Sequence, residues 1–93
     1  MPYSAKNMTK PVNFYYERPD ASSVRLIGDF NEWDLNSLPM ERREDGCWFV
    51  QVPLTHGHHQ YVFVVDGTPT LDPRASGTVQ VDRFARTSLI SVS

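Results

Sequence analysis

Three carboxylates surround one tryptophan in the first half of the chain, with Asp29, Glu32 and Asp34 placed around Trp33. A pair of carboxylates on either side of a sugar is what glycoside hydrolysis requires. These residues lie in a polar turn, however, where nothing encloses an acid, raises its pKa and excludes water. The pattern therefore predicts no catalytic residue in this stretch.

Three histidines form a second group of possible chemical interest, at His56, His58 and His59. Imidazole is the commonest metal-binding side chain. Adjacent side chains of an extended segment point to opposite faces, and no cysteine lies nearby to complete a tetrahedral site. We expect a polar turn that opens a strand, and neither a metal nor a cofactor.

Cys47 is the only cysteine, so an intramolecular disulfide is impossible and the fold must depend on its hydrophobic core. Its neighbours Gly46 and Trp48 provide no base that would activate a thiol. The serines and threonines occur in no nucleophile pattern, and no glycine-rich phosphate loop is present. An enzymatic function is not expected.

The two tryptophans have different surroundings. Trp48 shares a strand face with Val50 and Val52, which predicts a place in the core or at its margin. Trp33 follows a glycine and an Asx-rich turn. Its residue chemistry leaves two alternatives, in which the indole either stacks on a ligand at the surface or packs beneath its own turn.

The charge balance argues against a nucleic-acid partner. The 93 residues include 11 acidic and 9 basic side chains, with a formal charge of −2. Phosphate recognition needs clustered Lys and Arg, whereas Arg42 and Arg43 stand between Glu41 and Glu44. No apolar run reaches the roughly 18 residues of a membrane span, and the polar start lacks a signal-peptide core. We expect a cytoplasmic chain that contacts neither nucleic acid nor membrane.

Apolar residues alternate at period two in several short segments, which predicts strands at 12–17, 24–27, 47–52, 60–66 and 88–92. Residues 60–66 are apolar on both faces and should form a central strand. Asp45-Gly46 and Asp66-Gly67 are hairpin signals. Residues 74–86 alternate only weakly and are expected to loop, while residues 1–11 are expected to form a flexible tail before one domain at 12–93.

No segment carries apolar residues at helical spacing over three turns. Six to eight short strands separated by turn residues predict an all-β fold, an immunoglobulin-like antiparallel β-sandwich.

The order of several motifs carries a specific resemblance. These motifs are Gly28-Asp29-Phe30-Asn31-Glu32-Trp33, Pro39-Met40, Asp45-Gly46-Cys47-Trp48, Val52-Pro53-Leu54, His59 to Gly67 and Asp72-Pro73. Over roughly residues 12 to 92 the chain resembles the glycogen-binding, isoamylase N-terminal early-set domains. These are the family 48 carbohydrate-binding modules of branching and debranching enzymes and of the β subunit of AMP-activated protein kinase. The resemblance implies a sandwich that binds α-1,4-linked glucan without doing chemistry.

The resemblance also implies which residues would contact the sugar. Trp33 matches the first of two stacking tryptophans in the kinase module, but the second would fall at Thr68-Pro69, where this chain has no aromatic residue. The assisting lysine of that module would fall at Val62. The asparagine that bonds the sugar would fall near Thr87, which is polar but shorter.

The leading hypothesis is therefore a non-catalytic module that binds an α-glucan polysaccharide or maltooligosaccharide weakly, alone or beside a glycogen-metabolising enzyme. The predicted carbohydrate-binding residues are Trp33, Asn31, Asp34, Asn36 and Thr87. The alternative is a protein-interaction or regulatory sandwich that has lost its sugar site.

Overall fold

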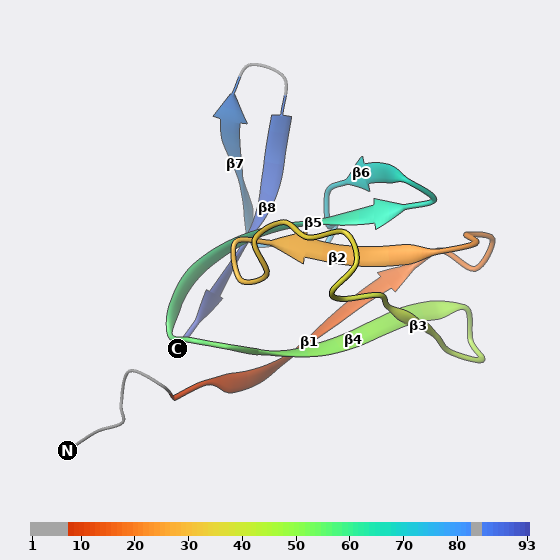
Figure 1. Ribbon diagram of the computed structural model, residues 1–93, viewed down its shortest axis with the longest axis horizontal. Coiled ribbons are helices and arrows are strands. Elements are labelled where there is room, and N and C mark those ends of the chain that lie inside the picture. The colour runs from red at the N-terminus through yellow and green to blue at the C-terminus, as the bar shows by residue number, and fades with distance from the viewer. Residues whose placement is uncertain (1–7, 83–84) are drawn as a thin grey trace.

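Eight antiparallel strands in two sheets make up the described part of the molecule (Figure 1). The computed structural model describes residues 8–82 and 85–93. Within these ranges there is no helix at all, and hence none that could cross a membrane. The all-β, immunoglobulin-like sandwich predicted from the sequence is confirmed.

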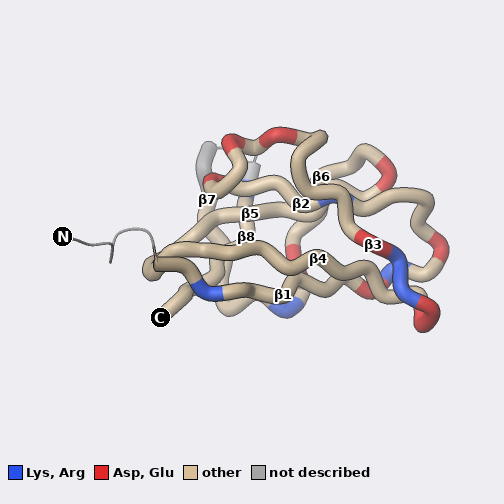
Figure 2. Tube along the Cα trace, turned by 60° about the horizontal axis from the view of Figure 1, so that its bottom comes forward, with Lys and Arg blue, Asp and Glu red and all other residues tan. Residues whose placement is uncertain are grey.

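The smaller sheet has the order β1-β4-β3, and the larger sheet the order β2-β5-β8-β7 with β6 also paired to β5. The strands are β1 (Lys10–Glu17), β2 (Val24–Gly28), β3 (Glu41–Arg42), β4 (Cys47–Leu54), β5 (Gly57–Val65), β6 (Thr68–Thr70), β7 (Gly77–Asp82) and β8 (Ala85–Val92). Figure 2 shows basic residues interspersed among acidic ones around the β3 hairpin, so the charge there is mixed.

The predicted strand faces meet in the core between the two sheets. Phe14, Leu26, Trp48 and Phe63 are all buried there. The residues that alternate with them on β1 and β4 face outward, as Asn13 does. Burial of these apolar side chains is the main force that holds the two sheets together.

β5 is the central strand of the larger sheet, as its apolar pattern predicts. It pairs with β2 along one side. Along its other side it pairs first with β8, over Gly57 to Tyr61, and then with β6, over Phe63 to Val65. Tyr61 and Phe63 face the core, while Val62 and Val64 on the opposite face are also buried. The outer face of this sheet therefore has an apolar floor beneath its loops.

Several segments differ from the sequence prediction. β3 and β6 were not predicted as strands, and β5 begins at Gly57, so His58 and His59, expected in a polar turn, lie within a strand. Residues 74–86, expected to loop, include β7 and the start of β8, which pair with each other along an edge of the sheet. In β7 the partly buried Val79 stands between the exposed Thr78 and Gln80, and pairing with β8 completes this short strand. β1 begins at Lys10, two residues before the predicted domain boundary at 12, and residues 1–7 of the predicted tail lie outside the described residues. The division into a tail and a domain stays a prediction.

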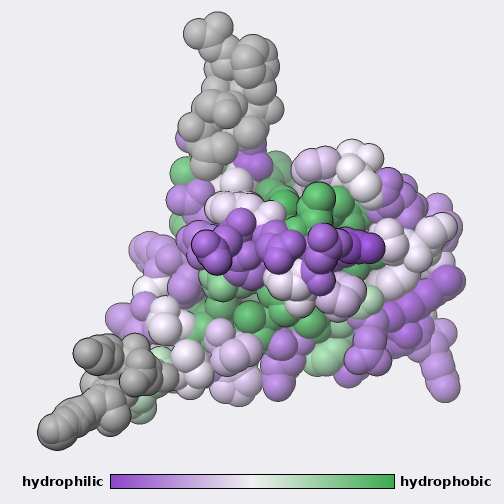
Figure 3. All heavy atoms as spheres, in the orientation of Figure 1, coloured by the Kyte–Doolittle hydropathy of each residue, from purple (hydrophilic) through white to green (hydrophobic). Residues whose placement is uncertain are grey.

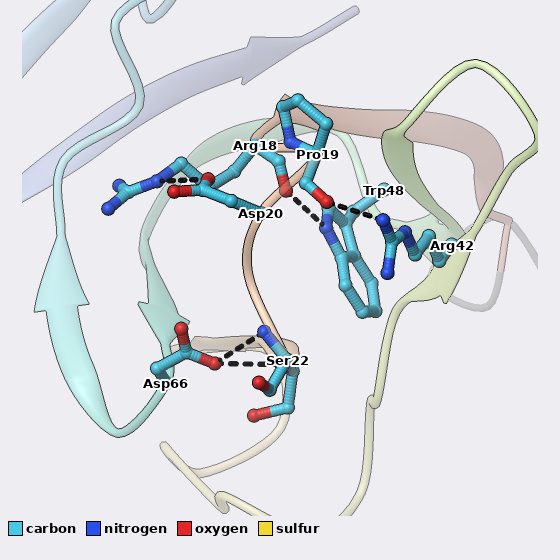
Figure 4. A network of polar contacts seen from close by, with 8 residues as sticks. Arg18, Pro19, Asp20, Ser22, Arg42, Trp48 and Asp66 are labelled. Atoms are coloured by element: carbon cyan, nitrogen blue, oxygen red, sulfur yellow. Dashed lines mark hydrogen bonds and ion pairs between the residues drawn. The ribbon is translucent and has the colours of Figure 1, made fainter.

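A polar network ties the turn after β1 to both sheets (Figure 4). Asp66, in the turn between β5 and β6, accepts bonds from the backbone N–H groups of Ser22 at 2.8 Å and Ser23 at 2.9 Å. On the other side, the indole N–H of Trp48 donates to the carbonyl of Arg18 at 2.9 Å. The indole is 6% exposed, so Trp48 is a core residue, as predicted.

Candidate functional site

The turn after β2 points two aromatic residues in opposite directions. Phe30 packs against the core, with its ring centroid 6.0 Å from that of Phe14. Trp33 stays on the surface with 39% of its area exposed. Of the two alternatives that the sequence left open for Trp33, the structure favours the surface position, because Phe30 is the residue that packs beneath the turn.

Trp33 is held by an unusual backbone. Glu32 and Trp33 adopt φ angles of 56° and 57°. These lie in the left-handed region of backbone conformation, which residues other than glycine seldom occupy. The Trp33 N–H donates to the carbonyl of Gly28 at 2.9 Å and closes the turn. Conformations of this kind persist where their surroundings enforce them, and they concentrate at binding sites.

Gly28 is required at the end of β2 because of space. A Cβ atom at this position would lie 2.6 Å from the carbonyl oxygen of Gln60 and 2.5 Å from a ring carbon of Phe30. Real Cβ atoms essentially never approach other atoms so closely. The glycine thus allows the turn to lie directly against β5.

The side chain of Asn31, a predicted sugar contact, points into its own turn. Its Oδ1 accepts from the Gly28 N–H at 2.9 Å, and its Nδ2 donates to the Leu26 carbonyl at 3.2 Å and to Ser37 Oγ at 2.9 Å. These bonds connect the end of β2 to the far side of the loop. The arrangement makes Asn31 a support of the turn that carries Trp33.

Asp29 fixes the start of the same turn to β5. Its Oδ2 accepts from the Gln60 N–H at 3.0 Å, and its Oδ1 lies 3.2 Å from His59 Nδ1. The other ring nitrogen of His59 lies 2.9 Å from the carbonyl of Thr55. The histidine predicted to belong to a polar turn therefore helps to hold Asp29.

A surface depression of about 570 Å³ lies beside Trp33, within the size range of ligand sites. Its lining includes Trp33 and Thr87, which are far apart in sequence. It also includes Val62 and Pro69, at the places where the family resemblance puts a lysine and a second aromatic residue. The structure thus brings all four aligned positions to one place.

The floor of this depression is apolar and one side is polar. Ile27 and Val62 line it from the outer face of β2 and β5. The side chains of Gln60 and Thr87 are joined by a hydrogen bond of 3.2 Å between Oε1 and Oγ1. In Figure 3 a hydrophilic band lies where the loop after β2 crosses this face in Figure 1, with hydrophobic surface on either side.

The bond from Asp29 to β5 and the place of Gln60 in the lining were not predicted from the sequence. Both depend on the pairing of β2 with β5, in which Gly28 lies opposite Tyr61. In the sequence, Asp29 directly follows Gly28 and Gln60 directly precedes Tyr61. Only the register of the two strands shows that they lie side by side.

Asp34 and Asn36, two further predicted contacts, do not line the depression beside Trp33. Asp34 Oδ1 accepts from the Asn36 N–H at 2.9 Å, and Asn36 Oδ1 accepts from Arg25 at 3.0 Å. Asn36 lines a separate hollow with Arg25 and Leu35. The structure therefore brings together Trp33 and Thr87 but not these two residues.

Among the described residues, the depression has no pair of carboxylates that could carry out hydrolysis. Asp29 is the one carboxylate in its described lining, and its oxygens already contact Gln60 and His59 of β5. Within residues 8–82 and 85–93, no group of three or more His, Cys, Asp and Glu residues is suited to hold a metal. The lining also includes Arg86, whose guanidinium can only donate hydrogen bonds. An apolar floor, an indole and these polar groups are suited to binding a polyhydroxylated ring.

Comparison with known families agrees with this chemistry. Residues 2–85 match the family described as carbohydrate-binding module 48, the isoamylase N-terminal domain. This match confirms the family predicted from the order of motifs.

Similar proteins include 1,4-alpha-glucan branching enzymes from distant organisms. The enzyme GlgB of Photobacterium profundum is 42% identical over 52 residues, which are 56% of this chain and 7% of the relative. GlgB of Aquifex aeolicus is 45% identical over 58 residues, covering 58% of this chain and 9% of the relative. The branching enzyme of Dictyostelium discoideum is 42% identical over 52 residues, which are 55% of this chain and 8% of the relative. The matched residues therefore cover less than a tenth of the length of each of these relatives.

Proposed function

Because this chain belongs to the carbohydrate-binding module 48 family, we propose that it binds α-glucan in the depression beside Trp33 and does no chemistry on it. The observation that carries the proposal is the meeting of Trp33 with Thr87 and Gln60 over an apolar floor. A glucose ring has an apolar face of C–H groups and a rim of hydroxyls. The depression offers a partner to each of them.

We assign a different role to each polar residue. Trp33 stacks on the apolar face of a glucosyl ring, while Gln60 and Thr87 exchange hydrogen bonds with its hydroxyls. Asn31 and Asp29 hold the turn and do not contact the sugar. Asp34 and Asn36 lie outside this depression and contribute at most to an adjoining part of a longer chain.

The proposed binding is weak. Pro69 and Val62 occupy the places of a second aromatic residue and a lysine, so a single indole provides the stacking. An aromatic contact contributes about 1 kcal/mol, whereas micromolar affinity needs about 8 kcal/mol. We expect a dissociation constant for short maltooligosaccharides near the millimolar range, which corresponds to about 4 kcal/mol.

We further propose that the module acts beside a glucan-active enzyme. Its relatives are named as 1,4-alpha-glucan branching enzymes, and this chain matches less than a tenth of each. A weak module has most effect next to a catalytic domain, because linkage raises the local concentration of the glucan. The cytoplasmic location expected from the sequence stays a prediction.

A direct test compares Trp33→Ala with Leu35→Ala. Both residues are exposed apolar side chains on the same loop, but only Trp33 lines the depression. Native gel retardation with glycogen and titration with maltoheptaose should show a loss of about fivefold or more for Trp33→Ala, the equivalent of about 1 kcal/mol. Leu35→Ala should bind like the unchanged protein.

The absence of any retardation or saturable binding at millimolar sugar would contradict the proposal. That result would support the second candidate, a protein-interaction sandwich that has lost its sugar site. The replacement of two expected sugar contacts by Val62 and Pro69 is the observation that favours this candidate.

A further inference from the structure

A second depression of about 570 Å³ lies at the open edge of β1. Its side-chain lining combines an aromatic ring with several polar groups, contributed by Asn13, Tyr15, Asp72, Arg74, Ser76 and Ser91. It shares no lining residue with the depression beside Trp33. The two lie on opposite faces of β5, since Tyr61 lines this one while Gln60 and Val62 line the other.

Tyr15 is positioned as an aromatic wall. It lies on the outward face of β1, directly opposite Phe49 of β4, with the two ring centroids 5.1 Å apart. The guanidinium of Arg43 lies 4.2 Å from the centre of the Phe49 ring and 5.9 Å from that of the Tyr15 ring, so it contacts Phe49 more closely than Tyr15. Among the described residues β1 pairs only with β4, and Tyr15 lines the depression at the open edge of β1.

Asp72 is held in place opposite this wall. Its Oδ2 accepts a bond of 2.6 Å from the hydroxyl of Tyr61, and its Oδ1 accepts from the Arg74 N–H at 2.8 Å. Its own N–H donates to Ser88 Oγ at 2.8 Å. Burial and the bond to Asp72 raise the pKa of Tyr61, so the phenol keeps its proton and remains a donor. Each carboxylate oxygen retains a lone pair for a further hydroxyl.

The remaining groups add hydrogen-bonding capacity without a net charge. Arg74 is exposed and makes no ion pair with a described residue. Asn13 Oδ1 accepts from Gln51 at 2.8 Å, so the amide of Asn13 is oriented while its Nδ2 can still donate. One carboxylate and one guanidinium balance each other, and this favours a neutral ligand over a phosphate or an acidic peptide.

We propose that this depression is a second carbohydrate-binding site, in which Tyr15 stacks on a glucosyl ring and Asp72, Arg74 and Asn13 bond its hydroxyls. The choice of a glucan as ligand rests on the function proposed above, while the position of the site does not. Two sites on opposite faces of β5 would allow one module to hold two chains of a branched polymer at once. Such bivalence raises the apparent affinity for glycogen above that for a short oligosaccharide.

The experiment is a titration of the ¹⁵N-labelled protein with maltoheptaose, followed by NMR. The indole N–H of Trp33 reports on the first site, and the backbone amides of Arg74, Ala75 and Ser76 report on the second. Both sets of signals should shift and saturate. Tyr15→Ala and Arg74→Ala should each weaken binding at the second set by about fivefold or more and leave the Trp33 signal unchanged.

Two further variants serve as controls. Tyr15→Phe keeps the aromatic ring and should retain most of the shift at residues 74–76. Glu17→Ala changes an exposed residue of the same strand that does not line the depression, and should behave like the unchanged protein.

The outcomes separate the two proposals. Shifts at Trp33 alone would overturn the second site and leave the first, and shifts at residues 74–76 alone would do the reverse. No shift at either would overturn both. Signals at residues 74–76 that move with protein concentration and not with sugar would mean that the β1 edge pairs with a second copy, and this result would also overturn the second site.

Discussion

Replacement of Asn31 by alanine tests the geometry on which the sugar site depends. The side chain bonds to four groups that hold the turn after β2, on Gly28, Leu26 and Ser37 and, at 3.4 Å, on the carbonyl of the exposed Asp34. Ser37 is exposed, so water replaces its bond in the variant. The Gly28 N–H and the Leu26 carbonyl belong to buried residues and lose their side-chain partner.

The expected cost follows from these two buried groups. A buried donor or acceptor left without a partner costs about 1 to 3 kcal/mol, so Asn31→Ala should lower the free energy of unfolding by about 2 to 4 kcal/mol. Domains of this size are stable by roughly 5 to 15 kcal/mol. The urea midpoint should therefore fall by on the order of 1 to 2 M.

Urea unfolding followed by tryptophan fluorescence measures this change, because buried Trp48 reports on the loss of the core. Asn36→Ala is the matched control, since Asn36 is an exposed asparagine of the same loop, and it should cost less than about 0.5 kcal/mol. Maltoheptaose binding by Asn31→Ala should also weaken, because Trp33 loses its support.

The reasoning would be refuted if Asn31→Ala kept its full stability and still lost the sugar. That combination would mean that Asn31 contacts the glucan directly, as its place in the sequence motif predicts. A loss of stability with unchanged binding would refute the link between the support and the position of the indole.

Three other predictions follow from single contacts. Gly28→Ala should destabilise the fold by about 2 to 3 kcal/mol through overpacking. Its control is Gly77→Ala, whose added Cβ would meet no atom within 4 Å and should cost no stability. Thermal unfolding of both variants measures the difference. Burial and the bond to Asp72 raise the pKa of Tyr61 above its ordinary 10.0, so the unfolded chain loses this proton first as pH rises. Stability should thus fall above about pH 10, and less steeply in Tyr61→Phe, when urea midpoints are measured against pH. Pro69→Trp should add a second stacking surface to the depression beside Trp33 and tighten maltoheptaose binding by about fivefold in calorimetry. An unchanged affinity would contradict the proposal that positions 33 and 69 contact the same sugar chain.

Local patterns predicted the parts of the fold that burial determines. The alternation of residues 60–66 identified the central strand, and the apolar neighbours of Trp48 placed it in the core. The prediction failed for β7 because its alternation of polar and apolar residues is short, covering only Thr78 to Asp82. Pairing with β8, which the sequence of β7 alone does not reveal, completes the strand.

The candidate site was predictable to the extent that it depends on one turn. Glycine, Asx residues and an indole in Gly28–Trp33 predicted a turn but left open whether Trp33 is at the surface or packs beneath it. The family resemblance favoured the surface position, and Trp33 is 39% exposed. The orientation of Asn31 and the position of Gln60 could not be predicted. Both depend on how the turn after β2 lies against other segments. The position of Gln60, for example, depends on the bond from its N–H to the Asp29 carboxylate, a residue 31 positions away in the sequence.

The proline at the open wall of the depression also bears on how long a glucan stays bound. Pro69 provides no second ring, so in the proposed complex the glucan would rest on Trp33 alone. With a dissociation constant near 1 mM and an association rate of about 10⁶ M⁻¹ s⁻¹, the complex dissociates about 10³ times per second. A residence time on the order of a millisecond suits a module that samples many branches of a polymer in turn. The same exchange would bring fresh chain ends to a neighbouring catalytic domain.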